Sequence, residues 1–180
     1  GGKAVSFIDG LMRKGYKGPL TSEALKTEAG NLYNWQIDKG LSAQPNITEE
    51  IYDRAWSITD RNGMIEPIKG SSKSRVSPDM PVVKGQLRIL EAYADKGMTG
   101  ANIMSIRRGI MNRMISNNTS TPEKNVLRNI LREFDEVTGQ LTDNIRVANS
   151  MYAKAMKADQ IEEMMLLAQN SATADRKSVV

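Results

Sequence analysis

The sequence predicts an all-α fold, a helical bundle of about six to seven helices in two lobes that a Gly/Ser/Pro-rich linker joins. Apolar residues recur every three to four positions along most of the chain, which is the period of an amphipathic helix. The Val/Ile/Tyr alternation that is typical of strands is missing. With 180 residues, of which 39% are hydrophobic, the chain is long enough for one domain or two small ones.

The composition excludes several kinds of chemistry. The chain has no Cys and no His, so thiolate or imidazole catalysis, disulfides and Cys/His metal sites are excluded. Lys and Arg total 25 against 21 Asp and Glu, and both signs are interleaved along the whole chain. This thin excess favours at most a weak contact with DNA. No apolar run is long enough to span a bilayer.

The N-terminal lobe is expected over residues 1–61, with helices over 4–14, 22–38 and 48–60. Thr21 or Ser22 can cap the second helix, and Asn46-Ile47-Thr48-Glu49 has the pattern of a capping box. Residues 62–81 form the linker, because Gly, Ser and Pro cluster there. The linker is either an ordered excursion packed on the helices or a flexible joint.

The C-terminal lobe is expected over 82–170, followed by a flexible tail over 171–180. Its first two helices are expected over about 83–96 and 100–116. A third starts at Thr121-Pro122-Glu123, and the last runs from Thr142 or Asp143 to about Ala168. Thr99 is the predicted cap of the helix over 100–116. That helix is expected to be central because it is apolar over much of its girth.

No pattern of catalytic, cofactor-binding or metal-ligating residues stands out, so we expect a non-enzymatic protein without cofactor or small-molecule ligand. Asp60-Arg61-Asn62-Gly63 fails as a calcium loop, because Gly63 comes too early and Ser71 stands at the twelfth position. The acids near residues 49–53 and 162–163 are explained by helix dipoles and outward faces. Glu28 lies within a helix, as the acid of some cell-wall lytic enzymes does, but Ala29 follows where those families usually have Ser.

Two residue sets are candidate contact surfaces. The first set is basic and can contact a partner protein or phosphates; its members are Arg107, Arg108, Arg113, Arg128 and Arg132. Glu133, Asp135 and Glu136 are close enough in sequence to neutralise part of its charge. The second consists of methionines of the last helix, which suit an adaptable binding surface or a core; its members are Met151, Met156, Met164 and Met165.

Four segments of the C-terminal lobe form a distinctive succession: Leu87-Arg88-Ile89-Leu90-Glu91, Ser105-Ile106-Arg107-Arg108-Gly109-Ile110, Ile130-Leu131-Arg132-Glu133-Phe134-Asp135 and Lys157-Ala158-Asp159-Gln160-Ile161-Glu162-Glu163. With the upstream stretch Gly18-Pro19-Leu20-Thr21-Ser22-Glu23-Ala24-Leu25, this succession resembles, over roughly residues 18–168, a recurrent helical region of large structural and ejection-type internal virion proteins of tailed bacteriophages. It implies a virion component inside the head or near the portal, whose partners are other virion proteins and copies of itself. Outside that context, a cytoplasmic protein is expected. The alternatives are an internal protein that contacts DNA and a cell-wall lytic domain that uses Glu28.

Overall fold

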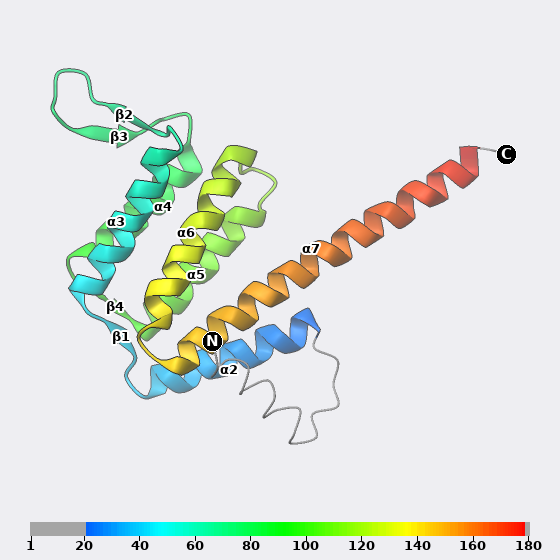
Figure 1. The fold of residues 1–180 in the computed structure, drawn as a ribbon, viewed down its shortest axis with the longest axis horizontal. Helices are drawn as coiled ribbons and strands as arrows, with labels where there is room; N and C mark the ends of the chain where they lie inside the picture. The colour runs from blue at the N-terminus through cyan, green and yellow to red at the C-terminus, as the bar shows by residue number, and fades with distance from the viewer. Residues whose placement is uncertain (1–20, 179–180) are drawn as a thin grey trace. The chain divides into compact units, whose positions relative to one another are not determined.

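A computed structural model describes residues 21–178, with side-chain surroundings described through Thr173. Helices dominate this part of the chain, which confirms the predicted all-α helical bundle (Figure 1). The helix predicted over residues 4–14 lies outside the described residues.

The chain forms two compact units that do not follow the predicted lobes. One unit is Tyr33–Arg146, and the other combines the described residues up to Leu32 with those from Val147 onward. The predicted linker, residues 62–81, therefore lies inside the larger unit. The reason is that α3 (Pro45–Arg61), which precedes the linker, packs against α4 (Pro81–Ala94) and α6 (Thr121–Gly139), which follow it.

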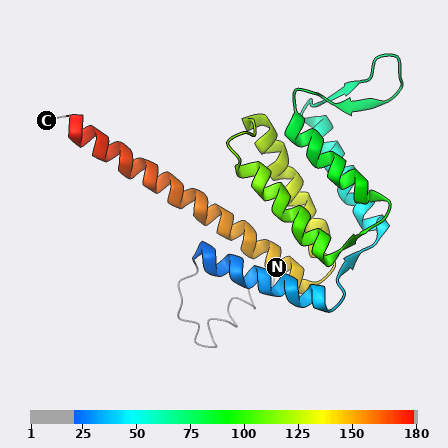
Figure 2. The ribbon, with the colours of Figure 1, turned by 180° about the vertical axis from the view of Figure 1, so that it is seen from behind.

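The larger unit is a bundle of α3, α4, α5 (Gly100–Ile115) and α6 (Figures 1 and 2). The apolar faces predicted from periodicity meet in its core. The residues that are fully buried there include Val83, Leu90, Ile103, Ile110, Leu127 and Phe134. The predicted apolar face of α5 is buried, since Ile103, Ile106, Ile110 and Met114 are all covered, but the helix is not buried around its girth, because Ile115 is 60% exposed.

Residues 62–81 are ordered, and they include an antiparallel hairpin at one end of α3 and α4 (Figure 1). Strands β2 (Ile65–Pro67) and β3 (Ser74–Val76) pair with Ile65 opposite Val76. A second two-stranded pairing joins β1 (Ser42–Ala43) to β4 (Met98–Thr99). Strands of two or three residues are too short to produce the alternation that reveals a strand in sequence.

Helix starts follow local capping chemistry, with two corrections to the sequence prediction. Thr99 caps α5 as predicted, and it does so through a capping box with Asn102. However, α3 begins at Pro45 and not at Thr48, because Pro is well suited to the first helical position. Similarly, Ser120 and not Thr121 caps α6, with its side chain accepting from the Glu123 amide.

The smaller unit contains the N-terminal part of α2 (Ser22–Asp38) and most of α7 (Asp143–Ser178). The bounds of α2 agree with the predicted 22–38. Leu25 and Ala29 of α2 are buried, as are Met151 and Ala155 of α7. Lys26 Nζ lies 2.7 Å from Asp159 Oδ2, so the two helices are also joined by an exposed ion pair.

The last helix is longer than predicted. It continues to Ser178, whereas its predicted end was about Ala168. The segment contains no Gly or Pro, and its Ala, Arg and Lys residues favour a helix. Figures 1 and 2 show α7 continuing well beyond the start of α2. Its last half is therefore a helix without a neighbour among the described residues of its own unit.

Candidate functional site

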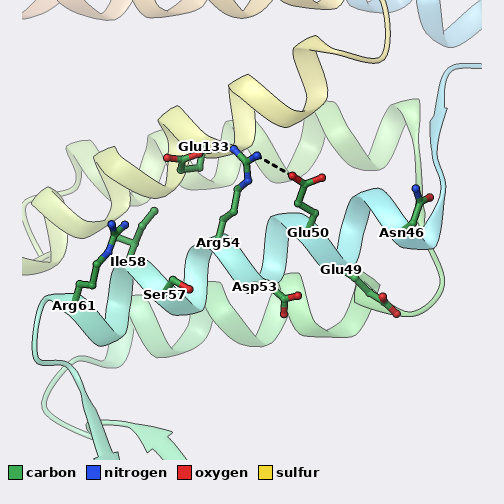
Figure 3. Close-up of a pocket in the computed structure, with 9 residues that line it drawn as sticks. All are labelled: Asn46, Glu49, Glu50, Asp53, Arg54, Ser57, Ile58, Arg61 and Glu133. Carbon is green, nitrogen blue, oxygen red and sulfur yellow. Dashed lines mark hydrogen bonds and ion pairs between the residues drawn. The ribbon is translucent and has the colours of Figure 1, made fainter.

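A cavity of about 580 Å³ lies along α3, on the side where α6 packs (Figure 3). Its lining is mostly charged and comes from both helices; it consists of Asn46, Glu49, Glu50, Asp53, Arg54, Ser57, Ile58, Arg61 and Glu133. Because several ionisable side chains line it, this cavity is the candidate binding or catalytic site of the larger unit.

Arg54 is the centre of this cavity and holds α3 to α6. Its Nη2 lies 2.7 Å from Glu50 Oε1, and its Nη1 lies 2.7 Å from Glu133 Oε2 and 3.6 Å from Glu136 Oε1. The hydrogen bond with Glu133, with that of Glu50 next, raises the pKa of Arg54 above its ordinary value. These groups satisfy one another, so the arrangement serves to join two helices.

The remaining acids of the cavity do not converge on a ligand position. Figure 3 shows Glu49 and Asp53 on the side of α3 away from Glu133. Among the described residues, no group of three or more acids is placed to hold a metal ion. Glu28 is half-buried on α2 and is not among the residues that line this cavity.

The five candidate arginines separate into two groups. Arg107 is only 2% exposed, and its guanidinium forms a two-pronged pair with Asp135 of α6 at 2.8 and 2.7 Å. Arg113 is half-buried and donates to Gln86 Oε1 of α4 at 2.9 Å. These two are corrections to the predicted contact surface, because both are used in packing helices together.

The other three arginines are exposed: Arg108 on α5, and Arg128 and Arg132 on α6. The acids that we expected to neutralise them are engaged elsewhere. Arg107 holds Asp135, and Arg54 holds Glu133 and Glu136. Within the described part of the chain, none of the ion pairs includes these three arginines, and Arg128 donates only to Asn125.

The methionines of α7 also separate. Met151 is 2% exposed and belongs to the core, which corrects its assignment to the contact surface. Met156 is half-buried. Met164 and Met165 are 69% and 67% exposed. They stand in a longer exposed apolar segment of α7 that also includes Ile161, Leu166 and Leu167.

Sequence reasoning did not single out Ile161 and Leu166 as surface residues, although a signal was present. Residues Met164–Ala168 are five consecutive apolar residues, which is more than one buried helix face can use. Two contacts had no sequence signal because their partners are distant along the chain: Arg54 donates to Glu133, 79 residues away, and the Val82 amide donates to Glu123, 41 residues away.

The comparisons with known proteins give no relative: no family model, no curated protein and no solved structure matches the chain. None of the helices formed by the described residues is long and apolar enough to cross a membrane.

Proposed function

We propose that the chain is a non-enzymatic structural component of a tailed-phage virion, which assembles through helix packing. The observation that carries this proposal is the apolar segment of α7. Five large apolar side chains between Ile161 and Leu167 are each at least half exposed. Soluble monomers rarely leave a contiguous apolar surface of this kind open, and such surfaces commonly mark protein–protein contacts.

The virion context comes from the resemblance of the helical segments, and the position inside the head or near the portal is part of the same proposal. The geometry supports a binding role over a catalytic one. The ionisable groups that pack α3 and α5 against α6, Arg54 with its glutamates and Arg107 with Asp135, are satisfied by each other. In contrast, the exposed part of α7 carries apolar side chains that a partner helix can bury.

The experiment is to purify particles of the phage or prophage that encodes the chain and to count its copies by quantitative mass spectrometry. We expect a fixed number of copies relative to the major capsid protein. The variant Met164→Glu/Met165→Glu should be lost from particles, while the charge-matched Gln160→Glu/Asn170→Asp should be retained. Absence of the wild-type chain from particles would overturn the proposal.

A second candidate function, contact with DNA, is favoured by one observation. Arg108, Arg128 and Arg132 are exposed and have no carboxylate partner among the described residues. Arg128 and Arg132 lie one turn apart on α6, and the pair between Arg107 and Asp135 places Arg108 on the neighbouring helix at a similar level. Three arginines on adjacent helices can contact successive phosphates of a duplex.

This candidate predicts a defined salt dependence. The logarithm of the association constant for a DNA duplex should fall against the logarithm of salt concentration with a slope of about −3, near −0.9 for each phosphate neutralised. Arg108→Gln/Arg128→Gln/Arg132→Gln should abolish binding. The control Lys69→Gln/Lys73→Gln/Arg88→Gln removes the same charge from other surfaces and should retain it. Equal loss in both variants would show that only net charge matters and would reject this function.

A further inference from the structure

The exposed apolar segment of α7 contains a regular stripe that the two-helix packing of its own unit does not use. Ala158, Ile161, Met165, Ala168 and Ala172 recur at spacings of three and four, which places them along one line of the helix. Ile161 and Met165 are 50% and 67% exposed. Ala168 and Ala172 are exposed, and Ala158 is half-buried.

The exposed part of the stripe lies beyond the contact of α7 with α2. Tyr152 and Asp159 mark the side toward α2, since an ideal Cβ on Gly30 lies 3.6 Å from the Tyr152 hydroxyl and Lys26 pairs with Asp159. At about 100° for each residue, Met165 lies roughly a third of a turn away from Asp159 around the helix, and Ile161 lies farther. Ala158 comes seven residues after the buried Met151, so the stripe extends that line of α7 into the part of the helix where Ile161 and Met165 are no longer covered.

The charges beside the stripe indicate what covers it. Between residues 156 and 174 the only charged side chains are those of Lys157, Asp159, Glu162 and Glu163. Lys157 and Glu162 are exposed and flank the stripe on opposite sides, five residues apart. When two such helices pair in parallel and in register, these are the positions that meet across the interface.

We propose that α7 pairs in parallel and in register with α7 of a second copy of this chain, through Ala158, Ile161, Met165, Ala168 and Ala172. By the two-fold symmetry of such a dimer, Lys157 of each copy faces Glu162 of the other, so two opposite-charge pairs form. The remaining flanking residues, Met164, Gln169 and Ser171, bring no like charges together. The three alanines let the helix backbones approach closely. This inference rests on the proposed function of α7 as an assembly surface.

The size of the surface predicts a weak dimer. The stripe is formed by only five residues, three of them alanines, so each copy has little apolar surface to bury. We expect the interface between two copies to bury an area near the lower limit for a specific interface, about 1,000 Å². The dimer should therefore form with a dissociation constant in the micromolar range and depend on concentration.

The test is sedimentation equilibrium of the full chain over a wide range of concentrations. We expect a monomer–dimer equilibrium for the wild type. Ile161→Glu/Met165→Glu should be monomeric, with an unchanged far-ultraviolet circular dichroism spectrum. The control Gln160→Glu/Asn170→Asp adds the same charge away from the stripe and should dimerise like the wild type. The proposal would be overturned if the wild type remained monomeric, or if Ile161→Glu/Met165→Glu dimerised like the wild type.

Charge exchange tests the parallel register. Lys157→Glu and Glu162→Lys should each weaken dimerisation about 5- to 10-fold, because each replaces two attractive pairs by repulsive ones. The double variant Lys157→Glu/Glu162→Lys should restore the wild-type constant. A double variant as weak as the single ones would exclude this register. The proposed function is tested separately, by the presence of the chain in purified particles. If the purified chain is monomeric but is present in virions, the proposed function stands and only the α7 dimer is rejected.

Discussion

Glu123 provides a cap for a helix other than its own, and its removal should be costly. Helix α4 begins after Met80 without a side-chain cap, so the amides of Val82 and Val83 need an acceptor. Both donate to Glu123 Oε2, at 2.8 and 2.9 Å. Ser120 Oγ donates to the other carboxylate oxygen at 2.9 Å, and the residue is only 2% exposed.

The magnitude follows from these contacts. Loss of an N-terminal cap costs about 0.5–2 kcal/mol, and a buried donor left without a partner costs about 1–3 kcal/mol. Glu123→Ala orphans two amides, so we expect it to lower the free energy of unfolding by about 2–4 kcal/mol. Glu123→Gln keeps one acceptor oxygen but loses the charge, and should cost about 1–2 kcal/mol.

The assay is urea unfolding at neutral pH, followed by the fluorescence of Trp35 and Trp56 and by circular dichroism. Glu136→Ala is the matched control on the same helix, because that carboxylate is 58% exposed and lies 3.6 Å from Arg54. It should cost no more than about 0.5 kcal/mol. If Glu123→Ala were as harmless as Glu136→Ala, the assignment of Glu123 as the cap of α4 would be wrong.

Three further predictions concern the backbone at two glycines and the pH dependence of one ion pair. Gly97 has φ +81°, and an added Cβ would lie 2.6 Å from the Ala43 carbonyl oxygen, so Gly97→Ala should destabilise the chain by about 2–4 kcal/mol in urea unfolding. Gly85→Ala, inside α4 with open space around it, should instead stabilise by about 0.5–1 kcal/mol; destabilisation there would contradict the described helix. The ion pair with Lys26 lowers the pKa of Asp159 below 3.8, so its small stabilising contribution is present at neutral pH and is lost as the pH falls through that lowered value. In Lys26→Met the Asp159 carboxyl titration, followed by NMR, should move upward, and an unchanged midpoint would show that the pair does not form in solution.

The positions of the helices could be predicted from the sequence because periodicity and breakers act locally. The bounds of α2 and α5 were within a residue of those expected, and Ile103, Ile106 and Ile110 are buried as their spacing indicates. Helix starts were harder to predict, because several neighbouring residues suit the start of a helix. Helix α3 starts at Pro45, three residues before the expected start, and the cap of α6 is Ser120 and not Thr121. The β2–β3 hairpin was missed because each strand has only three residues.

The surfaces could be predicted only in part, because sequence shows which side chains are charged but not which ones find partners. Arg107 and Arg108 are adjacent, yet one is buried against Asp135 and the other is exposed. Likewise, Met151 and Met165 belong to the same helix, but only the second lies beyond the contact with α2. The distinction depends on where neighbouring helices end, which is a property of the tertiary structure.

Because the chain contains no Cys, a single introduced thiol reports the contact of one α7 with another. Met165→Cys places the thiol in the apolar stripe, where parallel in-register helices bring the two Cα atoms within the roughly 4.4–6.8 Å that a disulfide needs. Asn170→Cys places it on the opposite side of the helix. Mild oxidation of the purified chain should link Met165→Cys into dimers and leave Asn170→Cys monomeric. Equal linking of both variants, or none at position 165, would contradict the role of α7 as the assembly surface.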